Sequence, residues 1–171
     1  LNYFFLKDEK FFECDQIILT SASSKTALSL AFLLSKNKLE DKKKIIGITS
    51  DKNIKFLSKI KFYDTVLSYD NAEEKLNTSK SIIVDFAGNS DYLKKLSDYL
   101  ADSLKYVSLI GLADWSSKTN FKSIPNSKVF FAPNHAEKRY RTMGVRKTTV
   151  LAEDLLKEFI MQIKHDIKLK Y

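Results

Sequence analysis

Short apolar runs alternate with helical patterns along most of the 171-residue chain. Runs such as "QIILT" and "SIIVDFAG" are short and rich in β-branched residues, which is typical of buried strands. Between them, apolar residues recur at helical spacing, as at Ala27, Leu30, Ala31 and Leu34. The expected strands cover residues 16–20, 44–50, 64–70, 81–88, 105–112 and 128–133. The expected helices cover residues 25–37, 51–61, 89–102 and 151–167.

This alternation predicts the α/β fold class. Continuous apolar strands separated by helices favour a parallel sheet that is covered on both faces. Because crossovers between parallel strands are right-handed, we expect a Rossmann-type, doubly wound, mostly parallel six-stranded sheet with helices on both faces. Ligands of such sheets bind beyond the carboxyl ends of the strands, near the point where strand order reverses. The loops that follow strands are therefore the places to look for a site.

The loop after the first strand, "TSASSKT" at residues 20–26, is called the serine loop below. It joins a strand to a helix, as phosphate-binding loops do, yet it contains no glycine. A helix N-terminus offers free N–H groups and the positive end of its dipole, so hydroxyls and a lysine there suit a diphosphate. The candidate ligands are Ser21, Ser23, Ser24, Lys25 and Thr26. The alternative is a helix cap without a ligand, formed by Ser23 or Ser24. An ATP-binding P-loop is not expected, because Leu19 and Ser24 occupy its two glycine positions.

The end of the second strand distinguishes between the two nicotinamide cofactors. NAD-binding folds carry a carboxylate at this tip, where it binds the ribose 2′-hydroxyl. Here the strand ends in "GITS", and Asp51 already begins the next helix. Ser50, Lys52 and Asn53 instead supply hydroxyl, ammonium and amide donors, a set that suits the 2′-phosphate of NADP. Read alone, the same stretch also fits a capped helix with an exposed lysine.

Composition and charge change this interpretation little. With 44% apolar and 29% charged residues, the chain has the composition of an ordinary globular protein. The net charge of +8 suggests nucleic-acid binding, but only three of the 29 basic residues are Arg and the lysines are spread along the whole chain. We therefore do not expect nucleic acid as a partner. One cysteine excludes a disulfide within this chain, and we expect no metal site. Neither a membrane-length apolar run nor a signal peptide is present, so we expect a cytoplasmic protein without membrane contact.

Five stretches together carry a family resemblance. In chain order they are "IILTSASSKTALSLAFLL", "IGITSDKN", "FYDTVLSYD", "VDFAGN" and "FFAP". Over most of residues 1–139 the chain resembles an uncharacterised bacterial family related to the medium-chain dehydrogenases/reductases, with the zinc-independent NADPH:quinone oxidoreductases as functional neighbours. The resemblance implies NADPH as cofactor and hydride transfer to a small-molecule acceptor without a metal. It assigns no substrate and no catalytic residue.

The resemblance also implies cofactor contacts in the loops after the later strands. The third strand ends where adenine is usually flanked, and the stretch after the fourth strand lies beside the cofactor. The ends of the fifth and sixth strands lie nearest the nicotinamide. The contacts implied in this way are Tyr69, Phe86, Ala87, Gly88, Gly111, Phe131 and Pro133.

In that superfamily the cofactor domain follows a separate catalytic domain. Residues 1–15 resemble the crossover between the two, and the chain begins with Leu1 and not with Met. We therefore expect a missing N-terminal catalytic domain as partner, an NADP-binding domain at 16–150, and a C-terminal helix at 151–171. We expect this chain to be inactive as an enzyme without that domain. The alternatives are a non-catalytic nucleotide-binding module and a basic nucleic-acid-binding domain, and a homodimer also stays open.

Several residues with reactive or charged side chains lie outside these motifs. His135 could donate a proton near the nicotinamide, although a solvated loop histidine is the simpler interpretation. Asp85 could act as a base, but its place at a strand end favours a cap or a salt bridge. Trp115 could belong to the core or cover the cofactor, and His165 is expected at the surface. The basic cluster is expected to be solvated, or else to contact a phosphate or the missing domain, and it consists of Lys138, Arg139, Arg141, Arg146 and Lys147.

Overall fold

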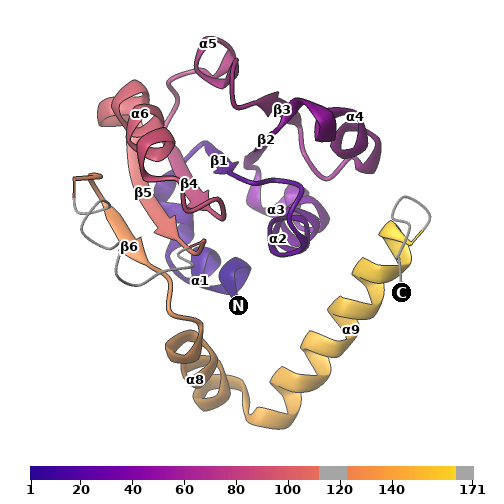
Figure 1. Cartoon of the computed structure of the whole chain (residues 1–171). Coiled ribbons are helices and arrows are strands. Elements are labelled where there is room, and N and C mark those ends of the chain that lie inside the picture. Colours follow the sequence, from indigo (N-terminus) through magenta and orange to yellow (C-terminus); the bar gives the residue numbers. More distant parts are fainter. Residues whose placement is uncertain (112–122, 165–171) are drawn as a thin grey trace.

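The computed structural model of the chain describes residues 1–111 and 123–164 (Figure 1). The strands are β1 (Gln16–Leu19), β2 (Lys44–Thr49), β3 (Thr65–Ser68), β4 (Ser81–Asp85), β5 (Leu104–Leu109) and β6 (Ser127–Val129). They form one six-stranded sheet in the order β3-β2-β1-β4-β5-β6, in which every neighbouring pair is parallel. The predicted α/β, Rossmann-like fold is confirmed.

Helices cover both faces of this sheet. In chain order the helical elements are α1 (Asn2–Asp8), η1 (Lys10–Glu13), α2 (Lys25–Lys36), α3 (Lys38–Asp41), α4 (Asp51–Ile60), α5 (Ala72–Lys75), α6 (Ser90–Leu100), η2 (Ala101–Ser103), α8 (Ala132–Met143) and α9 (Val145–Ile163). Buried residues of α1, α2, α4 and the end of α9 share one core cluster, and those of α5 and α6 share the other. Within the described ranges, no helix combines the length and apolarity that a membrane crossing needs.

The central strands contribute side chains to both cores, because successive side chains of a strand point to opposite faces of the sheet. In β1, Ile17 and Leu19 join the core under α2, whereas Ile18 joins the core under α6. All three are fully buried. Burial on both faces explains why these strands are continuous apolar runs without polar alternation.

The strand order reverses between β1 and β4. From β1 the chain moves outward through β2 to β3, and it then returns across the sheet to β4 on the other side of β1. The loops after β1 and β4 therefore leave their strands in opposite directions, and at such a switch point of an open sheet a ligand crevice is expected at the carboxyl ends of the strands; it is called the β1–β4 crevice below. Figure 1 shows α2 and α6 on either side of this point. This crevice positions the candidate site.

The end of the chain differs from the sequence prediction. The sixth strand stops at Val129, and "APNH" starts helix α8 with a proline in its first turn, a place where the missing N–H does no harm. The last helix begins at Val145, six residues earlier than expected, directly after Gly144 with its positive φ of 82°. Much of the surface of residues 145–150 is exposed, so no apolar face signalled this extra length. Figure 1 shows α8 and α9 as a V that projects from the sheet.

Candidate functional site

The serine loop begins α2 with a local cap. Ser24 has extended backbone angles, and its Oγ accepts a hydrogen bond from the Ala27 N–H at 3.3 Å, so it is one of the two caps expected from the sequence. Ser21 adopts the left-handed conformation, with a φ of 46°, which glycine usually provides. The Ser24 N–H donates to the Ser21 carbonyl at 2.8 Å and closes the turn. The loop thus contains a glycine-like turn without glycine.

Small residues let this loop lie close to the second strand. The Ala22 N–H donates to the Ile48 carbonyl at 3.0 Å, and the Tyr63 hydroxyl donates to the Ala22 carbonyl at 2.7 Å. A Cβ atom at Gly47 would lie 2.8 Å from the Tyr63 ring and 3.0 Å from the Ala22 Cβ. The loop is therefore supported from below by the close packing of Gly47, Ala22 and Tyr63.

The serine loop and the end of β2 meet in a cluster of hydroxyls around one amide. Asn53 Nδ2 lies 2.9 Å from Ser23 Oγ, 3.1 Å from Ser50 Oγ and 3.4 Å from Thr49 Oγ1. Thr49 Oγ1 also donates to Ser23 Oγ at 3.2 Å. The structure therefore joins Ser23, Ser50 and Asn53, which the sequence predicted as neighbours of one ligand. The amide hydrogens of Asn53 are donated to these protein hydroxyls. Asn53 therefore orients the hydroxyls, and its amide N–H groups are not available to a ligand.

Several donors beside this cluster have no acceptor among the described residues. They include the protons of the Ser23 and Ser50 hydroxyls and the main-chain N–H groups of Ser23, Lys25 and Thr26. Lys25 and Lys52 are exposed, and neither forms an ion pair within the described ranges. Amide, hydroxyl and ammonium donors at one helix N-terminus suit an anion.

Tyr69 reaches this crevice from the end of β3. Its hydroxyl accepts a hydrogen bond from the Ser21 N–H at 2.8 Å, and its ring meets the edge of Tyr92 with centroids 4.8 Å apart. The Tyr92 hydroxyl is buried and has no hydrogen-bond partner in the described part of the chain. Tyr69 therefore lies next to the serine loop, and its polar end faces that loop. Tyr92, in the first turn of α6, belongs to no motif that would have marked it as part of the site.

The wall on the β4 side is built around a buried carboxylate. Asp85 is 1% exposed and accepts hydrogen bonds from Thr20 Oγ1 at 2.5 Å, from Gly88 N–H at 3.0 Å and from Ala87 N–H at 3.2 Å. Burial raises the pKa of Asp85, and the Thr20 hydroxyl is the first of the bonds that oppose this. Asp85 is thus the strand-end cap favoured by the sequence. It fixes residues 86–88 against the start of the serine loop.

Gly111 completes this wall through backbone contact. A Cβ atom at Gly111 would lie 2.5 Å from the main-chain carbon and oxygen of Phe86 and 2.9 Å from the Ala87 nitrogen. The structure therefore packs Gly111 against the main chain of Phe86 and Ala87. The glycine is needed for packing between two chain segments, independently of any ligand.

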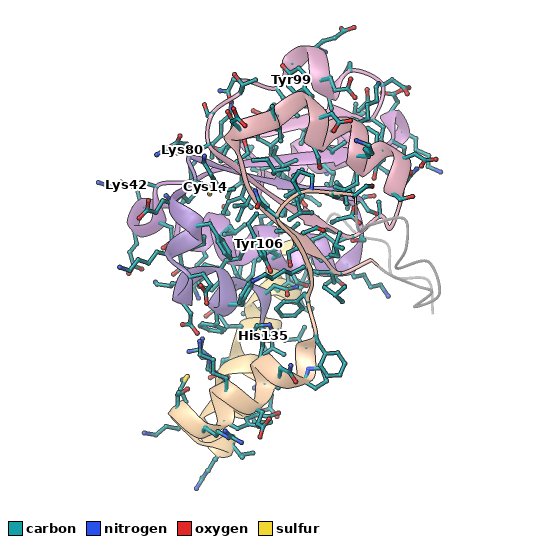
Figure 2. All side chains as sticks on the ribbon, turned by 90° about the vertical axis from the view of Figure 1, so that its left-hand side faces the viewer. Cys14, Lys42, Lys80, Tyr99, Tyr106 and His135 are labelled. Atoms are coloured by element: carbon teal, nitrogen blue, oxygen red, sulfur yellow. The ribbon has the colours of Figure 1, made fainter. Side chains whose placement is uncertain are left out.

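The remaining implied contacts belong to α8 and not to a strand end. Phe131 is the N-cap of α8 and Pro133 lies in its first turn, which corrects their assignment to the end of the sixth strand. His135 also belongs to this helix, so its assignment to a solvated loop was wrong. Its ring stacks on Phe130 at 4.4 Å and contacts Phe5 at 4.7 Å, below Tyr106 in Figure 2. Burial, followed by Lys138, lowers the pKa of His135.

Two residues of the basic cluster anchor α8 to α1. Lys138 and Arg139 reach the Asp8 carboxylate at 3.0 and 3.3 Å, and the Arg139 guanidinium lies 4.6 Å from the centre of the Phe4 ring. Arg141 pairs with Glu137 one turn earlier at 2.6 Å, and Arg146 and Lys147 are exposed. The expectation of a wholly solvated cluster is therefore corrected for Arg139. Trp115 and His165 lie outside the described residues.

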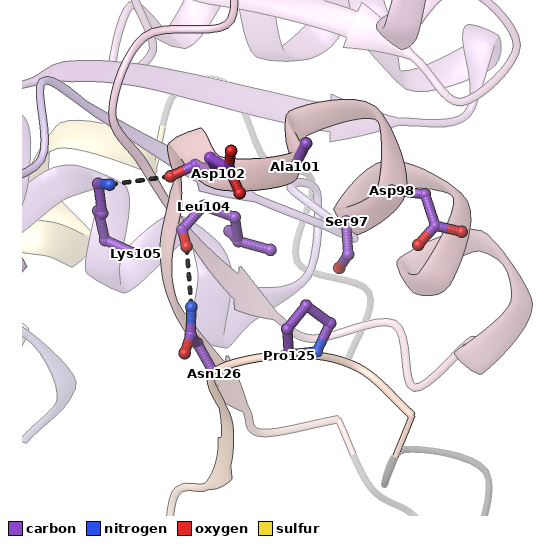
Figure 3. Close-up of a pocket in the computed structure, with 8 residues that line it drawn as sticks. All are labelled: Ser97, Asp98, Ala101, Asp102, Leu104, Lys105, Pro125 and Asn126. Atoms are coloured by element: carbon purple, nitrogen blue, oxygen red, sulfur yellow. Dashed lines mark hydrogen bonds between the residues drawn. The ribbon is translucent and has the colours of Figure 1, made fainter.

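A hollow of about 460 Å³ lies at the opposite end of the sheet, before β5 and β6 (Figure 3). Lys105 Nζ donates to the Asp102 carbonyl at 2.8 Å, and Asn126 Nδ2 donates to the Leu104 carbonyl at 3.0 Å. These bonds use the Lys105 and Asn126 side chains to hold main chain together, and the hollow lies away from the carboxyl ends of the strands. Open parallel sheets bind ligands at their carboxyl ends, so we place the site at the β1–β4 crevice.

The comparison with known proteins gives a family without an assigned activity. The chain belongs to the family described as protein of unknown function DUF2855, whose profile matches residues 1–170. No curated protein matches the chain. Within the described ranges, no three His, Cys, Asp or Glu residues are grouped so that they could hold a metal ion.

Proposed function

We propose that this member of the DUF2855 family binds NADPH at the β1–β4 crevice and presents its nicotinamide for hydride transfer. The observation that carries the proposal is the Asn53 cluster. Because Asn53 donates to Ser23 and Ser50, each hydroxyl is already an acceptor and keeps its own proton for an outside group. An anion that bridges the serine loop and β2 would accept both protons.

The donor set fits the cofactor's two phosphate groups. The N–H groups of Ser23, Lys25 and Thr26 at the N-terminus of α2, together with the Lys25 ammonium, would hold the diphosphate. Ser50 and Lys52 at the start of α4 would hold the 2′-phosphate, because a hydroxyl and an ammonium both stabilise that dianion. Asp51 is exposed in the first turn of α4 and there stabilises the helix dipole.

The wall formed by residues 86–88 and Gly111 would lie beside the nicotinamide half. When bound, NADPH supplies the hydride, which would pass to an electron-poor small molecule such as a quinone, and solvent would supply the proton. The chain's own residues would bind and orient the cofactor and exclude water. The proposal assigns no general acid or base, since a hydride donor needs neither at the nicotinamide carbon.

The test is a fluorescence titration with NADPH and NADH of the wild type, Lys52→Ala and Lys55→Ala. Lys52→Ala should weaken NADPH by about 10- to 100-fold and leave NADH almost unchanged, because only NADPH carries the charge that Lys52 meets. Lys55→Ala is the matched control, since it removes an exposed lysine one turn further along α4. Equal losses for both cofactors would refute the 2′-phosphate assignment, and a wild type that binds neither would refute the site.

Two further measurements separate this function from its alternatives. Steady-state NADPH oxidation with a panel of quinones tests hydride transfer, and turnover of a quinone by this chain would exclude a non-catalytic nucleotide-binding module. A titration with single-stranded RNA tests the basic surface. RNA binding that Lys52→Ala and Ser24→Asp leave intact would indicate a separate nucleic-acid function.

A further inference from the structure

The Tyr69 hydroxyl uses only half of its hydrogen-bonding capacity. It accepts from the Ser21 N–H at 2.8 Å, but its own proton has no acceptor in the part of the chain that the structure describes. A phenol can accept and donate at the same time. Burial raises the pKa of Tyr69, and the charge of Asp85 adds to this, so the proton stays on the oxygen at neutral pH. A donor is therefore left over in the crevice.

The tyrosine is held in place from three directions. Its main-chain N–H donates to the Thr49 carbonyl at 3.0 Å, its hydroxyl is tied to Ser21, and its ring packs on the edge of Tyr92 at an interplanar angle of 88°. These contacts come from β2, the serine loop and α6. A side chain fixed in this way is preorganised for a ligand, because it does not have to change conformation when the ligand binds.

We propose that Tyr69 is a cofactor-binding residue that extends the serine loop, accepting from the Ser21 N–H and donating to a diphosphate oxygen of the nucleotide. This inference rests on the proposed function and names a contact within that site. It differs from the role implied by the family resemblance, in which Tyr69 flanks the adenine ring. The hydroxyl, and not the ring, is then the group that recognises the ligand.

The structure also explains why such an extension is useful here. Ser21 takes the left-handed turn with a Cβ atom, so the ligand cannot approach its main chain as closely as it approaches glycine. The Tyr69 phenol oxygen accepts from the Ser21 N–H at 2.8 Å, and its own O–H group then offers a donor that lies further out than the Ser21 N–H. The serine loop, which has no glycine, thus regains a donor at a distance that a phosphate can reach.

The experiment compares Tyr69→Phe with the wild type and with Tyr99→Phe. Tyr69→Phe removes only the hydroxyl and keeps the ring on Tyr92. Tyr99→Phe is the matched control, because it removes a hydroxyl that donates to the Leu76 carbonyl at 2.7 Å, near the far end of α6. Each protein is titrated with NADPH and with adenosine 2′-monophosphate, which carries the adenine and the 2′-phosphate but lacks the diphosphate. Hydrogen exchange of the Ser21 amide is followed by NMR without ligand.

Tyr69→Phe should weaken NADPH by about 10- to 100-fold, the effect of one hydrogen bond to a charged group, and should leave adenosine 2′-monophosphate unchanged. The Ser21 amide should exchange faster in Tyr69→Phe than in the wild type or in Tyr99→Phe. Unchanged or tighter NADPH binding by Tyr69→Phe would overturn the contact, as would an equal loss for both ligands, which would assign Tyr69 to the adenine. A wild type that binds neither ligand would refute the proposed function itself, and this contact with it.

Discussion

Thr20 is the residue whose replacement best tests the wall on the β4 side. Its hydroxyl donates to Asp85 at 2.5 Å and accepts from the N–H groups of Phe86 and Ala87 at 3.0 and 3.3 Å. Thr20 is fully buried, and valine has nearly the same shape. Thr20→Val therefore removes three hydrogen bonds without opening a cavity. Ala87 keeps its bond to Asp85, whereas Phe86 loses the partner of its N–H.

The expected loss is about 3 kcal/mol of unfolding free energy. A hydrogen bond to a charged group contributes about 1.5 to 3 kcal/mol, and an unpaired N–H that water reaches in part adds about 1 kcal/mol. With a urea dependence of about 2 kcal/mol per molar, the unfolding midpoint should fall by about 1.5 M. Thr149→Val is the matched control, because its hydroxyl only bonds back to the Val145 carbonyl on an exposed helix surface.

The loss should depend on pH. Burial raises the pKa of Asp85 above the ordinary value of 3.8, and the Thr20 hydroxyl opposes this, so Thr20→Val raises that pKa further. A folded state with a raised pKa binds the proton more readily than the unfolded state, so its stability falls as pH rises through this range. The difference between the two proteins should therefore be largest at neutral pH and shrink toward pH 3.8. A loss below 1 kcal/mol at pH 7, or one that grows on acidification, would refute this account of Asp85.

Three further predictions concern the crevice and the core. Ser24→Asp should abolish NADPH binding through charge repulsion and leave urea unfolding nearly unchanged, since acids are tolerated at helix N-termini; unchanged affinity would mean that the loop is only a cap. Gly47→Ala should destabilise the protein by about 1 to 3 kcal/mol, because its Cβ atom would lie 2.8 Å from the Tyr63 ring, and an unshifted midpoint would contradict this packing. Burial raises the pKa of the Cys14 thiol to about 11, so thiol reagents at pH 8 should label it only after denaturation, and rapid labelling of the folded protein would contradict its burial.

The parts of the fold that depend on local signals could be predicted from the sequence. Apolar runs fixed the six strands of the sheet, and the cap at Ser24 set the start of α2 because capping involves only neighbouring residues. The start of α8 could not be read in this way. "FFAP" continues the apolar, aromatic run that follows β6, and a proline fits the end of a strand as well as the first turn of a helix.

Within the site, the sequence predicted which residues lie near one another but not which way their side chains point. The sequence indicated that Tyr69, Asn53 and Ser23 lie near one crevice, because strand ends meet at one edge of a parallel sheet. It could not show that the Tyr69 hydroxyl bonds to Ser21, 48 positions away, or that Asn53 donates to Ser23. Both bonds depend on crossovers that bring distant segments together. His135 was misassigned because α8 was not predicted, and the contact of its ring with Phe5, 130 positions away, also depends on the fold.

A serine loop can bind a phosphate as a glycine-rich loop does only if other residues supply what glycine provides. Glycine offers a positive φ and room for close approach. Here Ser21 adopts the positive φ itself, at a cost of about 1 to 2 kcal/mol, and its bond to Tyr69 helps to hold it there. The room comes from Ala22 and Gly47, which let the loop settle on β2. The lack of glycine after β1 is therefore no argument against a phosphate site, because serine at these positions keeps the turn and adds hydroxyl donors.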